Sequence, residues 1–267
     1  MVAVPAIVLG GGALSAGKPY PRSVAVSERV RHAKRLFAGL GSTYGRVGAV
    51  LSFGQDPRWR RFMVSRVRVP GSGTVLDIAT GTGLVARRLA ATTPAGRIVG
   101  LDQSAPMVRQ AVRDVARAGV GHRISFVLGD GQRLPFADGT FDAATFTYLA
   151  RYVDDLGATL GEIARVLKPG ASMANLEFHL PAMPVWRPLW WLYTRTVLPL
   201  AGRVVSPEWF DVGRFLGPSI ERLYRQHPLD EQLSLWRRAG IGDVRARVMS
   251  LGGGVVIWGA KAGQDAR

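Results

Sequence analysis

The residues best placed to do chemistry lie in one short stretch, residues 75–83, which reads Val-Leu-Asp-Ile-Ala-Thr-Gly-Thr-Gly. The apolar run Val75–Ile78 predicts a short buried strand of a parallel sheet, and residues 84–90 predict a helix. Gly81 and Gly83 let the backbone turn sharply between the two and let a ligand approach bare main chain. Because a helix N-terminus offers unpaired N–H groups, the pattern predicts a nucleotide-like cofactor at this turn.

The spacing of the turn leaves the identity of the cofactor open. Gly81-x-Gly83-x-x-Ala86 is compatible with a dinucleotide fingerprint, and Asp102 lies 19 residues beyond Gly83, where a ribose-binding carboxylate is expected. A plain tight turn without a ligand is the alternative. Asp77 favours a functional site, because a carboxylate inside a buried strand is costly unless it has a partner.

Three further motifs narrow the choice of cofactor. They are Gly100-Leu101-Asp102, Gly129-Asp130-Gly131 and Arg165-Val166-Leu167-Lys168-Pro169-Gly170. Together with the glycine turn they resemble the motif series of the class I S-adenosylmethionine (SAM) methyltransferases. An NAD-dependent enzyme would account for the first two elements but not for the others.

A segment before the glycine turn, residues 44–61, carries a second resemblance. It is similar to the N-terminal signature of the UbiE/MenG family, the C-methyltransferases of ubiquinone and menaquinone biosynthesis, which runs Tyr-Asp-x-Met-Asn, then Leu-Ser, then His-x-x-Trp. The matching residues are Tyr44, Leu51, Ser52 and Trp59. The signature's Asp, Met, Asn and His are replaced by Gly45, Val47, Gly48 and Asp56. The basic residues Arg58, Arg60, Arg61, Arg66 and Arg68 are predicted to be mostly a solvated helix face.

The alternation of predicted strands and helices is typical of a doubly wound sheet. Strands are predicted over residues 74–79, 97–101, 124–128, 141–147, 172–178, 244–249 and 254–259, and core helices over 83–92, 105–118, 155–167 and 230–239. Pro169-Gly170 predicts the stop after the third of these helices. We therefore expect an α/β, Rossmann-like, doubly wound, seven-stranded class I methyltransferase sheet with a terminal β-hairpin, an N-terminal helical lid and a helical insertion after strand five.

The expected organisation is one SAM-dependent methyltransferase domain, residues 27–267, after a disordered extension, residues 1–26, which is small, apolar and glycine-rich. Within the domain we expect a lid (27–70), a SAM-binding core (71–178), a substrate-covering insertion (179–228) and a terminal helix with its hairpin (229–262). The insertion is rich in Trp and Leu and is interrupted by arginines, which suits either a membrane interface, a prenyl tail or ordinary helix packing.

The resemblance implies a set of cofactor-binding residues. Asp77 would order the glycine loop and bind the amino group of SAM. Asp102 would accept hydrogen bonds from the ribose hydroxyls, and Asp130 with Gly131 would contact the edge of the adenine. Turn chemistry is the alternative role for the last two aspartates, and core packing is the alternative for Met107. The full set is Asp77, Ala79, Gly81, Thr82, Gly83, Asp102, Gln103, Met107, Asp130, Gly131 and Thr147.

Three residues are candidates for catalysis. Arg151 matches the arginine of the family's Leu-Arg-Asn element and would stabilise a developing oxyanion. His179 follows the predicted fifth strand and has an imidazole suited to a general base, although a single histidine is often purely structural. Tyr44 would close over SAM.

Composition limits the remaining classes of function. The net charge of +16, from 35 basic and 19 acidic residues, favours either a phosphate-rich partner or a generally arginine-rich surface. The chain has no cysteine and its four histidines lack metal-ligand spacing, so no metal is expected. We predict C-methylation of a small hydrophobic quinol or phenol. The alternatives are a paralogue that methylates another small molecule at C, O or N in secondary metabolism and, less favoured, an RNA methyltransferase.

The same considerations give expectations for partners and location. No apolar run is long enough to span a bilayer, so a cytoplasmic protein is expected, with contact at the inner face of the membrane left open. No nucleic-acid partner is expected, and a homodimer is left open.

Overall fold

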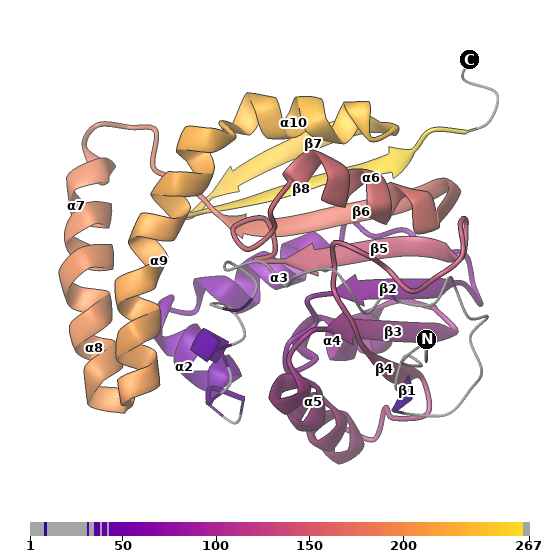
Figure 1. The fold of residues 1–267 in the computed structure, drawn as a ribbon, viewed down its shortest axis with the longest axis horizontal. Helices are drawn as coiled ribbons and strands as arrows, with labels where there is room; N and C mark the ends of the chain where they lie inside the picture. Colours follow the sequence, from indigo (N-terminus) through magenta and orange to yellow (C-terminus); the bar gives the residue numbers. More distant parts are fainter. Residues whose placement is uncertain (1–7, 10–30, 32–34, 38, 42, 264–267) are drawn as a thin grey trace.

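The computed structural model describes residues 8–9, 31, 35–37, 39–41 and 43–263, whose strands form one mixed sheet (Figure 1). The strands are β1 (Val8–Leu9), β2 (Thr74–Ile78), β3 (Arg97–Asp102), β4 (Ile124–Leu128), β5 (Phe141–Thr147), β6 (Leu167–Phe178), β7 (Ile241–Met249) and β8 (Gly254–Lys261). Their order is β1-β4-β3-β2-β5-β6-β8-β7. The five central strands β4, β3, β2, β5 and β6 are parallel, and β8 is antiparallel between β6 and β7.

Helices cover both faces of this sheet. The helical elements are α2 (Tyr44–Leu51), α3 (Gln55–Val64), α4 (Leu84–Thr92), α5 (Ala105–Arg117), α6 (Leu156–Val166), α7 (Trp186–Leu192), the π-helical turn η1 (Tyr193–Val197), α8 (Leu198–Val205), α9 (Pro207–Gln226), α10 (Leu229–Arg238) and η2 (Ser250–Gly252). Side chains of β2 alternate between two buried clusters. Val75 packs with α3, α4 and α5 on one face, whereas Leu76 and Ile78 pack with α6 and α10 on the other.

The expected doubly wound sheet is confirmed, with differences at two places. Helix α6 ends at Val166 and β6 already begins at Leu167, because Leu167 pairs with Phe141 across the sheet. The predicted helix over 155–167 is confirmed to within one residue at each end, but Pro169-Gly170, which follow its end, lie within β6, whose predicted start was residue 172. At the other edge, β1 pairs antiparallel with β4 and adds an eighth strand to the seven expected. The remainder of the predicted extension, residues 1–7 and 10–26, lies outside the described residues.

The insertion after β6 forms a helical arm beside the sheet. In Figure 1, α7 and α8 run along α9 on the outer side of the molecule. Two glycines make the close approach of α8 and α9 possible: a Cβ at Gly202 would lie 2.4 Å from the Trp209 carbonyl oxygen, and one at Gly213 would lie 2.7 Å from the Pro199 Cα. Within the described ranges, none of the helices combines the length and hydropathy that a bilayer span requires.

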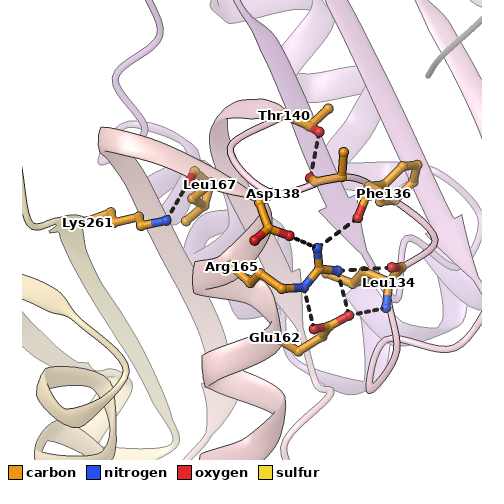
Figure 2. Close-up of polar contacts among 9 residues, drawn as sticks. Leu134, Phe136, Asp138, Thr140, Glu162, Arg165, Leu167 and Lys261 are labelled. Atoms are coloured by element: carbon orange, nitrogen blue, oxygen red, sulfur yellow. Dashed lines mark hydrogen bonds and ion pairs between the residues drawn. The ribbon is translucent and has the colours of Figure 1, made fainter. Parts of the chain in front are cut away.

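The loop that follows β4 is fastened to α6 by one arginine (Figure 2). The Arg165 guanidinium donates hydrogen bonds to Glu162 (2.8 Å), Asp138 (2.6 Å) and the Phe136 carbonyl (2.9 Å), and Glu162 also accepts the Leu134 N–H (2.7 Å). This loop starts at the Gly-Asp-Gly motif. The arginine of the later motif therefore supports the loop from outside the cavities described below.

Candidate active site

The glycine turn between β2 and α4 is held in an uncommon backbone conformation. Ala79, Gly81 and Gly83 have φ values of 53°, 56° and 73°, in the left-handed region that favours glycine. The Asp102 carboxylate at the end of β3 accepts the Gly81 N–H at 2.8 Å, and the Thr80 N–H donates to the Leu101 carbonyl at 3.0 Å. Strand β3 therefore fixes the turn. A left-handed alanine at such a place is the kind of strain that accumulates at functional sites.

Asp77, near the end of β2, supports the turn through its carboxylate. Its carboxylate is fully buried and accepts hydrogen bonds from the hydroxyls of Thr80 (2.6 Å) and Thr145 (2.7 Å). These two partners offset part of the cost of burying a charge within a strand. Burial raises the pKa of Asp77 to about 6, against the opposing effect of the two hydroxyl hydrogen bonds.

We expect Asp77 to make stability depend on pH. The folded state binds this proton more tightly than the unfolded state, where the ordinary value is 3.8, so the unfolding free energy falls as pH rises from about 4 to about 6. The fall attributable to this group is about 3 kcal/mol and is complete above pH 7. Asp77→Asn preserves the shape and removes the titration. Urea unfolding of both proteins from pH 4 to pH 8 should show this difference, and parallel curves would contradict it.

A cavity lies at the carboxyl ends of β2, β3, β4 and β5, where open α/β sheets bind ligands. Most of the cofactor residues predicted from the sequence line it: Ala79, Gly81, Thr82, Asp102, Gln103, Met107, Asp130, Gly131 and Thr147. Asp77 and Gly83 lie outside the lining. Tyr44 reaches the same cavity from α2.

The polar atoms of this cavity suit a nucleoside. The two Asp102 carboxylate oxygens are oriented by the N–H groups of Gly81 and Ser104, each at 2.8 Å, and carboxylate oxygens accept more than one hydrogen bond, as two vicinal hydroxyls require. Gln103 Oε1 and Ser104 Oγ are buried and find no hydrogen-bond partner in the described part of the chain. A buried polar atom without a partner is costly unless a ligand satisfies it. The residues present therefore fit a nucleoside-type cofactor.

A second cavity of about 270 Å³ adjoins the first. Its walls come from α2, α3, η1, α8 and α9 and are mainly apolar and aromatic, including Leu51, Trp59, Phe178, Tyr193, Leu198, Trp209, Phe215 and Ile220. Five residues line both cavities: Phe37, Tyr44, Arg60, Tyr148 and Tyr152. The two spaces therefore meet at a largely aromatic junction, and an apolar ring could lie there beside the cofactor.

A buried polar cluster stands beside this junction. The Arg60 guanidinium donates from Nε to both carboxylate oxygens of Asp56 (3.1 and 2.9 Å), and one of its terminal nitrogens donates to Thr147 Oγ1 (3.3 Å). The Tyr148 hydroxyl donates to Asp56 at 2.5 Å. This cluster differs from the sequence-based prediction, in which the arginines of residues 58–68, Arg60 among them, form mostly a solvated helix face. The i,i+4 spacing of Asp56 and Arg60 on a helix was the available signal.

The three candidate catalytic residues lie at different places relative to the two cavities. Tyr44 lines both cavities, as its predicted position over the cofactor requires. Arg151 lines only the second cavity and is bonded to Glu177 (2.9 Å) and Ser219 (3.0 Å). His179 is not among the residues that line either cavity.

The surroundings of His179 are those of a packed side chain. Its Nδ1 lies 3.1 Å from the Gly252 carbonyl oxygen, and its ring packs edge-on against Tyr224 at a centroid distance of 4.8 Å. Burial lowers the pKa of His179, so the imidazole is neutral at physiological pH. Its arrangement supports a contact between the end of β6 and the turn before β8.

Known proteins resemble this chain in sequence and in fold. The sequence matches the ubiE/COQ5 methyltransferase family over residues 24–261. It is 36% identical over 228 residues to the ubiquinone/menaquinone biosynthesis C-methyltransferase UbiE of Desulfotalea psychrophila, covering 85% of this chain and 89% of that protein. It is 34% identical over 238 residues to the demethylmenaquinone methyltransferase of Roseiflexus castenholzii, covering 88% of this chain and 96% of that protein.

The fold comparison agrees. A crystal structure of a SAM-dependent methyltransferase from Aquifex aeolicus superposes with a TM-score of 0.52 at 18% identity, covering 76% of this chain and 89% of that one. The family match spans most of the chain, and the cavity fits the cofactor that the motifs imply. The chain therefore belongs to the ubiE/COQ5 methyltransferase family and is a SAM-dependent methyltransferase.

Proposed function

We propose that this enzyme methylates a ring carbon of a lipophilic quinol or phenol. The observation that carries the proposal is the apolar second cavity, which meets the cofactor cavity at an aromatic junction. The names of the two relatives described above support a quinone-type acceptor. Bound SAM supplies an electrophilic methyl group carried on a sulfonium.

Residues of the first cavity would hold the cofactor in a fixed orientation. Asp102 would bind the ribose hydroxyls, and Asp130 with Gly131 would lie against the adenine. Thr82 and the backbone at Gly81 would contact the methionine portion. Fixing the donor beside the second cavity matters because positioning supplies much of the rate of an in-line displacement.

The helical arm supports access from a membrane. Nine of the fifteen large apolar side chains exposed in the described chain lie within residues 183–205, including Leu192 (57% exposed) and Val204 (89% exposed). This segment holds three arginines and no acidic residue. Inner-facing residues of the same segment line the second cavity. An apolar, cationic surface is complementary to a bilayer of anionic lipids, and we propose that the arm rests on one.

The test is mass-detected methyl transfer from SAM to demethylmenaquinol held reduced in vesicles. We expect a product heavier by one methyl group, formed faster on anionic than on neutral vesicles. Val212→Trp fills the second cavity and should raise KM for the quinol, whereas Val112→Trp, exposed on α5, should not. On the arm, Leu192→Asp should reduce vesicle sedimentation, with Val248→Asp on β7 as its matched control.

Each part of the proposal has its own contrary result. If the enzyme methylates other small molecules but no quinol or phenol, the proposed acceptor class is overturned. Equal sedimentation of Leu192→Asp and Val248→Asp on anionic vesicles would overturn the membrane contact and leave the acceptor class standing.

A further inference from the structure

Among the described residues that line both cavities, and so form the junction between them, one side chain is charged. Of the five shared residues, one is Phe37 and three are tyrosines. Burial raises the pKa of Tyr44, raises that of Tyr148 well above its ordinary value and raises that of Tyr152 to about 12, so all three hydroxyls are neutral at physiological pH. The remaining group is the Arg60 guanidinium. A methyl group passing from cofactor to acceptor therefore passes beside Arg60.

Arg60 is held so that part of its guanidinium is available to a ligand. Its Nε is committed to Asp56 and one terminal nitrogen donates to Thr147 Oγ1. A guanidinium carries five N–H donors, and the others make no hydrogen bond with described residues. The side chain is 8% exposed, and it lines both cavities. Its free donors are therefore open to an oxygen atom lying at the junction.

We propose that Arg60 binds the acceptor's ring oxygen and stabilises its ionised form during methyl transfer. The inference rests on the proposed phenolic acceptor and adds the residue that activates it. The hydroxyl proton leaves to solvent, and the oxygen's electron density moves to the adjacent ring carbon. That carbon bonds to the methyl group as the bond to sulfur breaks, with its electron pair staying on sulfur. The proton of the same carbon then also leaves to solvent, which restores the aromatic ring.

Asp56 and Tyr148 act as positioning residues for Arg60. Asp56 accepts three hydrogen bonds from Arg60 and Tyr148, so protonating it would leave a buried guanidinium without its counter-charge, which disfavours Asp56 as the base. The Tyr148 ring is stacked on Phe178 at a centroid distance of 4.4 Å, and its backbone holds a left-handed φ of 58°. Strain of this kind persists where the surroundings determine the conformation. The pairing with Asp56 also offsets the Arg60 charge next to a cationic sulfonium.

The test measures the ionisation of a bound phenol directly. 1-Naphthol is titrated spectroscopically in complex with the full-length protein and S-adenosylhomocysteine. We expect the pKa of bound naphthol to be lowered by about one unit or more, as an opposite charge within hydrogen-bond distance produces. Arg60→Gln should abolish the lowering and reduce kcat with little change in SAM affinity. Arg61→Gln, on the exposed side of α3, is the matched control and should behave like the wild type.

Further variants separate function from folding. Because Arg60→Gln leaves a buried carboxylate unpaired, the double variant Arg60→Gln/Asp56→Asn removes both charges and should fold while still failing to lower the naphthol pKa. Tyr148→Phe keeps the ring stack and should reduce the lowering only in part. Asp56→Asn keeps one carbonyl acceptor for the Arg60 Nε and should likewise reduce the lowering only in part.

The outcomes distinguish this inference from the proposed function. If the folded double variant still binds naphthol and still lowers the pKa of naphthol, the role of Arg60 is overturned, whereas the proposed acceptor class stands. Loss of kcat in Asp56→Asn equal to that in Arg60→Gln, with the lowering retained, would make Asp56 the base and overturn its positioning role. No binding of naphthol to the wild type, together with no quinol turnover, would overturn the proposed acceptor and this inference with it.

Discussion

Asp102→Ala is expected to weaken SAM binding by about 100-fold or more while leaving the sheet folded. Hydrogen bonds to a charged group contribute about 1.5–3 kcal/mol each, and two such bonds to the ribose correspond to this loss or a larger one. The carboxylate also orients the turn, since it accepts the N–H groups of Gly81 and Ser104. Isothermal titration with SAM measures the affinity, and circular dichroism checks the fold.

Two comparison variants sharpen this result. Asp102→Asn keeps one carbonyl acceptor and should fall between wild type and alanine. Asp154→Ala removes a carboxylate from the exposed segment before α6 and should bind SAM normally. Unchanged affinity in a folded Asp102→Ala protein would show that the cofactor does not lie against β3, and the cavity assignment would fail.

The cofactor side of the site could be predicted because its signals are local. A strand that ends in Gly-x-Gly and a helix that follows it define the turn within ten residues, and Asp102 ends the neighbouring parallel strand. The carboxyl ends of parallel strands must meet at one edge of a sheet. Nearly all the cofactor residues predicted from the sequence therefore line one cavity.

The acceptor side could not be predicted in the same way, because its residues come together only through tertiary packing. Asp56 and Tyr148 are 92 positions apart and meet because α3 packs against β6 and β8, beside the residue that follows β5. Arg60 was one arginine among many in the sequence, and only the packing of α3 on the sheet separates it from the exposed Arg58 and Arg61. His179 lies at the expected strand end, but its ring turns toward Gly252, which no local pattern indicates.

Arg151→Met is expected to lower the free energy of unfolding by about 3–5 kcal/mol, the usual cost of breaking a buried ion pair from one side. The side chains of Arg151 and Glu177 are 2% and 0% exposed, and their contact is 2.9 Å. Burial raises the pKa of Glu177, with Arg151 opposing the shift. Loss of the arginine leaves that carboxylate uncompensated. Urea denaturation at pH 7 measures the change.

The double variant Arg151→Met/Glu177→Gln separates structure from chemistry at this position. It removes both charges, so most of the lost stability should return, because neutral replacements of buried ion pairs are often tolerated. If Arg151 serves mainly to hold Ser219 and the end of β6, the rate of methyl transfer should recover together with the stability, to within about tenfold of the wild-type rate. A tenfold lower rate corresponds to a loss of about 1.4 kcal/mol in transition-state stabilisation. We expect this result, because Arg151 already donates to Glu177 and Ser219 and, unlike Arg60, does not line the junction of the two cavities. A stable but inactive double variant would instead place Arg151 on the acceptor's oxygen, as its position in the sequence motif suggested.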